Sequence, residues 1–174
     1  MREFMAAYVR VIERFNHRVG RMAMYLIFVL IAVLLWSSFT KVMPGMRPSL
    51  WTLEMAQYLM VAYYMLGGPY SIQLDTNVRM DLVYGQFSHR RKAFVDSFTV
   101  VFLIIYLGFL LYGGLDSLNY AITFGERSSS AWRPYLWPVK TVMVIGIFLM
   151  LLQAVAELFK DIENVRNGAP EGAS

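Results

Sequence analysis

The chain has 174 residues, of which 57% are hydrophobic and 16% are charged, and its formal net charge is +4. This balance differs from that of ordinary soluble domains and favours an integral membrane protein of one domain. Because the sequence contains no Cys, it excludes disulfides, thiolate metal ligands and thiol nucleophiles. The basic residues flank apolar runs instead of forming one patch, so nucleic acid is not an expected partner.

The first predicted element is an uncharged apolar run over residues 22–40. At 1.5 Å per residue it measures about 28 Å as a helix, which suffices to cross the hydrocarbon core. The preceding residues 1–21 are too polar to be the apolar core of a signal peptide, because they include Arg2, Arg10, Arg14, Arg18 and Arg21. We therefore predict a cytoplasmic basic segment over 1–21 and an uncleaved signal anchor after it.

The second predicted span covers residues 50–74, after a short loop with Pro44, Gly45 and Pro48. Its only charged residue is Glu54, close to one end. The sequence Gly67-Gly68-Pro69 is expected to weaken or kink the far end of this helix.

A polar connector over residues 75–92 precedes a third predicted span at 94–115. A mixed polar and aromatic loop then leads to a fourth span at 134–156, where Pro134 and Pro138 suit a helix entrance. The transmembrane domain is thus expected to cover residues 22–158. Residues 159–174 form a predicted cytoplasmic tail, which begins as a charged helical extension and ends without an apolar face to bury.

Charge and aromatic residues predict the orientation. Of the sixteen Lys and Arg residues, five lie before the first span, four in the 75–92 connector and two in the tail, against five on the opposite side. The positive-inside rule places both termini in the cytoplasm. All four Trp residues fall near the predicted outer interface, which agrees with this orientation: Trp36, Trp51, Trp132 and Trp137. The fold class is therefore an all-α membrane bundle of four helices, N-in and C-in.

The sequence offers little support for catalysis or for a cofactor. Its only histidines, His17 and His89, lie outside the apolar spans and so cannot ligate haem from facing helices. The zinc-hydrolase, phosphate-loop and hydrolase-elbow motifs are absent from the sequence. We expect no enzyme activity and no cofactor or metal site.

Three ionisable residues lie within or beside the predicted spans, where charges are costly. Glu54 is interpreted as a hydrogen-bond acceptor for a neighbouring helix, with a proton-binding or cation-binding carboxylate as the alternative. Asp96 and Lys140 lie near helix entrances, from which their side chains can reach the headgroups.

The connector holds two further candidate sites. Arg79 and Asp81 are two residues apart and can pair with each other or with backbone groups at helix ends. Arg90, Arg91 and Lys92 are candidate contacts for lipid headgroups, although a topology signal alone would explain this cluster.

In these positions the sequence resembles the small membrane (Q-type, DctQ-like) subunit of tripartite ATP-independent periplasmic (TRAP) transporters. The resemblance rests on the order of short motifs between four spans, over roughly residues 21–158. These motifs are Glu54, Asn77-Val-Arg79-Met-Asp81, Gly125-Glu126-Arg127-Ser128 and the Trp132 to Pro138 stretch. Asn77 departs from the family, which often has His there.

The resemblance implies a non-catalytic subunit in the bacterial inner membrane, which supports a large membrane subunit during sodium-driven uptake of an organic anion such as a carboxylate. A periplasmic substrate-binding protein is the implied third partner, and Glu126, Arg127 and Ser128 are candidates for docking it. Two alternatives stay open: a small homodimeric exporter that uses Glu54, and a structural protein of another membrane complex.

Overall fold

A computed structural model describes residues 2–43, 49–74 and 89–167 of the chain. Within this part the chain forms four helices and no strand, which confirms the all-α prediction. The helices are α1 (Arg2–Val42), α2 (Thr52–Gln73), α4 (His89–Thr123) and α5 (Trp137–Asn167). The side chains of α4 are described from Phe98 onward.

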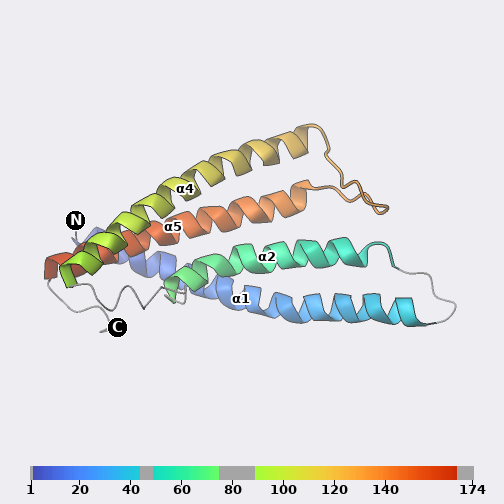
Figure 1. Cartoon of the computed structure of the whole chain (residues 1–174), viewed down its shortest axis with the longest axis horizontal. Coiled ribbons are helices and arrows are strands. Elements are labelled where there is room, and N and C mark those ends of the chain that lie inside the picture. Colours follow the sequence, from blue (N-terminus) through green and yellow to red (C-terminus); the bar gives the residue numbers. More distant parts are fainter. Residues whose placement is uncertain (1, 44–48, 75–88, 168–174) are drawn as a thin grey trace.

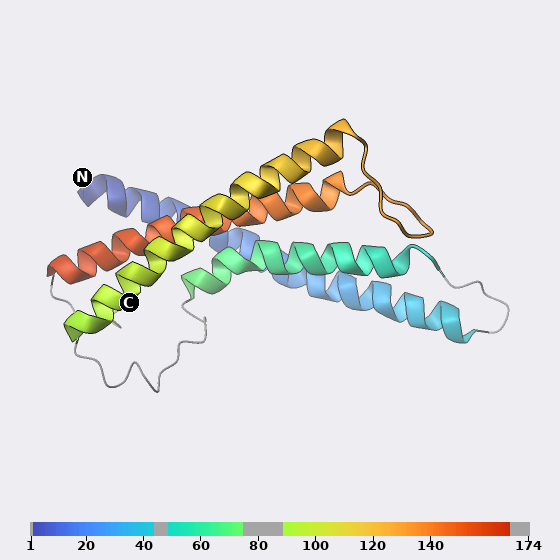
Figure 2. The same ribbon diagram turned by 45° about the horizontal axis from the view of Figure 1, so that its top comes forward.

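The helices form two antiparallel hairpins, α1 with α2 and α4 with α5 (Figure 1). The helix α5 joins the hairpins, because it packs against α4, α2 and also α1. Figure 2 shows that α1 crosses the bundle obliquely, so that its N-terminal part lies beside the C-terminal part of α5. The start of α1 and the end of α5 therefore lie at the same end of the bundle.

The helices are longer than the spans predicted from hydropathy. α1 has 41 residues, about 61 Å at 1.5 Å per residue, which is twice the thickness of a hydrocarbon core. It continues without interruption through the boundary predicted at residue 21, and α4 and α5 likewise extend into the predicted connector, loop and tail. A charged residue ends an apolar run, but it does not end a helix. The backbone hydrogen bonds of the helix continue in the part that extends beyond the hydrocarbon core.

Three of the helices contain stretches long and apolar enough to cross a membrane: Met5–Val42, Phe98–Thr123 and Trp137–Lys160. The remaining helix, α2, is not among these stretches, because Glu54, Gln57 and four tyrosines interrupt its apolar residues. Its 22 residues measure about 33 Å, which is long enough for the crossing predicted at residues 50–74. The helix is continuous through Pro69, where the sequence predicted a weak point.

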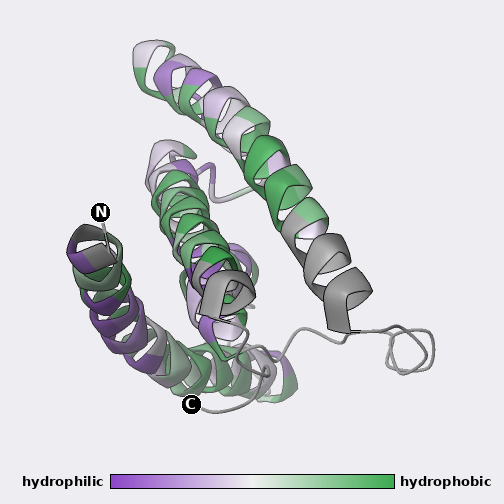
Figure 3. Cartoon of the chain, turned by 90° about the vertical axis from the view of Figure 1, so that its left-hand side faces the viewer, coloured by the Kyte–Doolittle hydropathy of each residue, from purple (hydrophilic) through white to green (hydrophobic). Residues whose placement is uncertain are grey.

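Packing in the described part is apolar outside and partly polar inside. The core cluster of Leu107, Ile147 and Ala154 is small, and the fully buried side chains include Asn16, Thr52 and Gln153. Many large apolar side chains point outward instead, among them Tyr25, Phe28, Phe102, Phe109 and Tyr112. Figure 3 shows green turns along the middle of α4 and purple turns in the N-terminal part of α1. This arrangement suits a lipid environment, which does not penalise exposed apolar surface.

Hydroxyl groups close the α1–α2 hairpin at its turn. The Thr52 hydroxyl lies 3.0 Å from that of Ser37 and 3.1 Å from that of Ser49, and the Ser49 hydroxyl lies 3.3 Å from that of Thr40. Each group can act as donor to one neighbour and acceptor from another. The start of α2 is thereby fixed to the end of α1.

The α2–α5 contact depends on a close backbone approach at Gly146. A Cβ atom at this position would lie 2.6 Å from the backbone oxygen of Met65, too close for any side chain. Pro69 lies four residues after Met65 and carries no N–H to donate to that carbonyl. The Met65 carbonyl therefore faces α5 at the point where α5 has no side chain.

Candidate functional site

The α4–α5 loop is folded by its own backbone. α4 ends in a Schellman motif: the Glu126 amide donates to the Ala121 carbonyl at 3.0 Å, and Gly125 has the left-handed φ of 59° that the motif requires. The Ser128 amide then donates to the carbonyl of Pro134 at 2.9 Å, and the Leu136 amide to that of Glu126 at 3.0 Å. The loop is thus a short hairpin with defined positions for its side chains.

Glu54 of α2 meets this loop at Ser128. The Ser128 hydroxyl donates to Oε1 of Glu54 at 2.9 Å, and Glu54 is only 7% exposed. Its second oxygen, Oε2, is buried without a hydrogen-bond partner among the described residues. The contact joins residues 74 positions apart and links the two helical hairpins directly.

Tyr58, one turn after Glu54, adds a second link. Its hydroxyl donates to the backbone carbonyl of Tyr135 at 3.3 Å. Tyr135 in turn holds Arg127, because the guanidinium donates to the Tyr135 hydroxyl and its carbon lies 4.2 Å from the ring centroid. α2 therefore contacts both arms of the loop hairpin.

Glu126 forms an ion pair with a lysine of α5, and not with the neighbouring Arg127. Its carboxylate forms an ion pair with Lys140 of α5 at 2.5 Å, and the same ammonium donates to the Ser117 carbonyl of α4 at 3.4 Å. Lys140 thereby connects the two helices at the base of their loop. We call these residues the loop cluster: Glu54, Tyr58, Glu126, Arg127, Ser128, Tyr135 and Lys140.

The structure thus brings together five residues singled out in the sequence, although not as one site: Glu54, Glu126, Arg127, Ser128 and Lys140. Glu54 and Ser128 are in direct contact, whereas Glu126 and Arg127 point to Lys140 and Tyr135. Sequence reasoning missed the two tyrosines, since a tyrosine near a predicted interface is ordinarily interpreted as an anchor.

The structure does not describe the side chains of the remaining candidates. Arg79 and Asp81 fall between the described ranges. Arg90, Arg91 and Lys92 belong to the first turn of α4, where the backbone alone is described.

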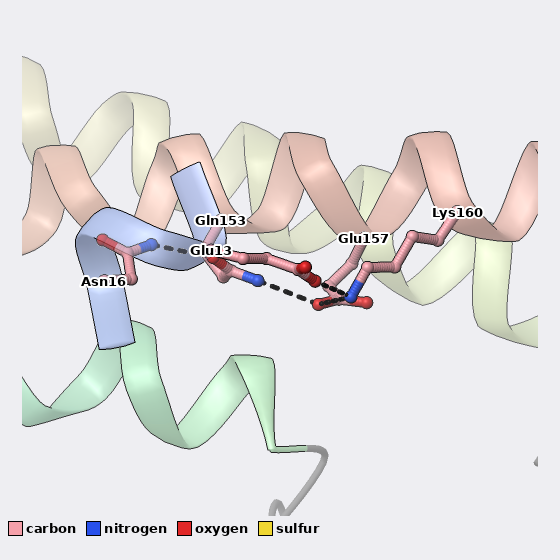
Figure 4. A network of polar contacts seen from close by, with 5 residues as sticks. All are labelled: Glu13, Asn16, Gln153, Glu157 and Lys160. Carbon is pink, nitrogen blue, oxygen red and sulfur yellow. Dashed lines mark hydrogen bonds and ion pairs between the residues drawn. The ribbon is translucent and has the colours of Figure 1, made fainter. Parts of the chain in front are cut away.

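A second polar cluster, which the sequence did not predict, joins α1 to α5 at the opposite end of the bundle (Figure 4). Asn16 donates to Gln153 at 2.7 Å, and Gln153 donates to Glu157 at 2.9 Å. The Lys160 ammonium lies between Glu157 and Glu13, forming ion pairs with both carboxylates. We call these five residues the α1–α5 network. Gln153, as a lone amide in an apolar run, was the sequence signal for it.

These two clusters connect helices. The loop cluster links α2 to the α4–α5 loop at one end, and the α1–α5 network links α1 to α5 at the other. An additional cleft of about 210 Å³ lies beside the network, lined by Met5, Ala6, Val9, Arg10, Phe159 and Lys160. The polar side chains of the loop cluster and of the α1–α5 network mainly contact other members of the same cluster.

Comparison with known families gives one match. The sequence model described as "Tripartite ATP-independent periplasmic transporters, DctQ component" matches residues 43–164, which include α2, α4, the loop cluster and most of α5. A search of curated proteins gives no match.

Proposed function

Since the chain belongs to the DctQ family and is the small component of a TRAP transporter, we propose that it acts as a rigid support for the large membrane subunit of that transporter. In this proposal the complex takes up an organic anion, such as a carboxylate, in a sodium-driven process that depends on a periplasmic binding protein. The chain itself contributes structure and no catalytic step.

The observation that carries this proposal is the linkage of the two hairpins at both ends. Glu54–Ser128 and Tyr58–Tyr135 join them at the loop end, and the α1–α5 network joins them at the other. Between these points, Gly146 and Met65 bring α5 and α2 into backbone contact. Such a body resists internal movement, as a support for a moving partner must.

The outward faces supply the surface for such a partner. Large apolar side chains are exposed along both outer helices, including Phe28 and Leu35 on α1 and Phe102 and Phe109 on α4. Such surfaces pack against lipid or against another membrane helix. The buried position of Glu54, bonded to Ser128, supports a structural role for this carboxylate over a role in a transport pathway.

The binding protein is the proposed partner of the loop. Of the three docking candidates, Glu126 is neutralised by Lys140, and Ser128 is partly buried against Glu54. Arg127 is exposed, and its hydrogen bond and ring contact with Tyr135 leave its charge uncompensated. We infer that Glu126 and Ser128 shape the loop and that Arg127 faces the partner.

Co-purification with a large membrane subunit tests the proposal. We expect the tagged chain to retain the large subunit in mild detergent, and proteoliposomes with both chains to take up substrate only with a sodium gradient and loaded binding protein. Arg127→Gln should raise the binding-protein concentration at half-maximal uptake, and Ser129→Ala, at an exposed neighbouring position, should not. A chain that purifies alone as a dimer and transports by itself would contradict the proposal and favour the small exporter.

A further inference from the structure

The N-terminal part of α1 presents two distinct faces. One face packs against α5: the Tyr8 hydroxyl donates to the Leu152 carbonyl at 3.3 Å, the Tyr8 ring meets Phe159 edge-on, and Asn16 is 1% exposed beside Gln153. These contacts fix the rotation of α1 about its axis. The opposite face is therefore held away from α5.

Four arginines form a stripe on that opposite face, and the first of them, Arg10, also borders the cleft that Phe159 and Lys160 line. Arg10, Arg14, Arg18 and Arg21 are spaced by four, four and three residues, and all four side chains are exposed. At about 100° per residue these spacings confine the four side chains to roughly 80° of the helix surface. The stripe is about 17 Å long and ends where the apolar span begins. We call it the arginine stripe.

Acidic side chains of the bundle do not neutralise the stripe. Within the described part of the chain, none of its four arginines forms an ion pair with a carboxylate, and Arg10 donates to the backbone carbonyl of Ala6. Glu13, the nearest acidic residue on α1, is engaged with Lys160 on the α5 side. Glu3 lies two turns before Arg10, about 10 Å along the axis.

Exposed apolar side chains border the stripe along one edge. Val11 is 66% exposed, Phe15 52% and Met22 72%, and the helical spacing places all three beside the arginines. Water favours the arginines but not this apolar edge. A membrane interface accommodates both, because apolar side chains enter the acyl region while guanidinium groups reach the phosphates.

We propose that the arginine stripe binds anionic phospholipid headgroups at the membrane surface on the side of the N-terminus. The positive charge selects anionic lipids over zwitterionic ones, and the apolar edge, continuous with the span, selects a membrane over an acidic protein surface. This site is independent of the proposed transport function. It also differs from the Arg90 to Lys92 cluster, which lies in another helix.

Spin-labelled lipids provide the test. The full chain is reconstituted in phosphatidylcholine vesicles that contain trace spin-labelled phosphatidylglycerol or phosphatidylcholine, and the motionally restricted fraction is measured by EPR. We expect the wild-type chain to restrict phosphatidylglycerol several-fold more than phosphatidylcholine at low salt. One basic residue near a membrane contributes roughly fivefold to binding, so Arg14→Gln with Arg18→Gln should abolish most of this preference. High salt should weaken the preference in the wild-type chain.

The matched control removes two exposed cations elsewhere, Lys41→Gln with Arg133→Gln, and should retain most of the preference. Because the chain lacks Cys, Val11→Cys also accepts a single nitroxide, which should be more shielded from a water-soluble relaxation agent in vesicles containing phosphatidylglycerol. Equal restriction of both lipids by the wild-type chain would overturn the proposal, as would an equal loss of preference in both double variants. Unchanged lipid preference in Arg14→Gln/Arg18→Gln, with loss of a co-purifying subunit, would instead assign the stripe to a protein partner.

Discussion

At the scale of single residues, the contact between Glu54 and Ser128 can be tested directly, because the Ser128 hydroxyl is the donor that the described residues offer to the Glu54 carboxylate. Ser128→Ala should lower the free energy of unfolding by about 1–3 kcal/mol, since it leaves a buried carboxylate oxygen without its donor. Glu54→Gln keeps an acceptor at the same place and should cost less. Unfolding in mixed micelles titrated with sodium dodecyl sulfate measures both changes.

A double-mutant cycle separates this bond from other effects of the two substitutions. The Ser128→Ala and Glu54→Leu changes should be non-additive, with a coupling of about 1 kcal/mol. Ser129→Ala, on an exposed neighbour, serves as the control and should couple to neither. Strict additivity of the first pair would show that the bond contributes nothing to the fold.

Gly146 gives a second prediction at this scale. In Gly146→Ala the new Cβ would meet the backbone oxygen of Met65 at 2.6 Å, and backbone atoms of two helices cannot move apart without loss of packing. We expect destabilisation of about 1–3 kcal/mol in the same unfolding titration. Gly113→Ala is the matched control, because nothing lies within 4 Å of its added Cβ. Equal stability of the two variants would contradict the close approach.

At the scale of helices, the α1–α5 network decides how α1 is held. Gln153→Leu removes the acceptor of Asn16 and should cost about 1–3 kcal/mol, because a buried amide N–H then lacks a partner. Replacing both residues, as Asn16→Leu with Gln153→Leu, removes donor and acceptor together and should recover part of that loss. The measurement is the free energy of unfolding of all three variants. A double variant less stable than either single variant would contradict this interpretation.

The helices also show where sequence reasoning reaches its limit. Apolar runs located the helices at residues 22–40, 94–115 and 134–156, since hydropathy responds to the hydrocarbon core. The helix ends lie well outside these runs, as at Arg2 and Asn167, because they depend on backbone hydrogen bonds and on neighbours such as Lys160. α2 was predicted at residues 50–74 from a run whose only charge is Glu54, although it is not among the three stretches that are apolar enough to cross a membrane by composition alone.

The same distinction applies to the candidate site: its unusual charge and its motif could be seen in the sequence, but the contacts between them could not. Glu54 stood out in the sequence because a charge in an apolar run is costly, and the motif at residues 125–128 stood out by resemblance. Their contact could not be predicted, since it depends on how the loop folds across α2. Tyr58 and Tyr135 lacked any such warning, because tyrosines are common at membrane interfaces, and the lone amide of Gln153 was the only sign of the α1–α5 network.

At the scale of the whole molecule, the predicted orientation can be tested by labelling. The absence of Cys allows Glu3→Cys and Ser129→Cys to be studied as single thiols, and both positions are exposed. With both termini in the cytoplasm, a membrane-impermeant maleimide should label Ser129→Cys in intact cells, and should label Glu3→Cys only after permeabilisation. The reverse pattern would invert the predicted topology.

The Met65 carbonyl has a consequence for how the bundle is assembled. In an α-helix the amide of residue 69 would donate to this carbonyl, but Pro69 has no N–H. The Met65 oxygen is therefore left without its helical donor on the side of α2 that α5 covers. Sliding α5 by one turn, about 5.4 Å, would move Gly146 away and bring a bulkier residue against that oxygen. Gly146 and Met65 therefore fix the register of α5 against α2, because a side chain in place of Gly146 would clash with the Met65 carbonyl.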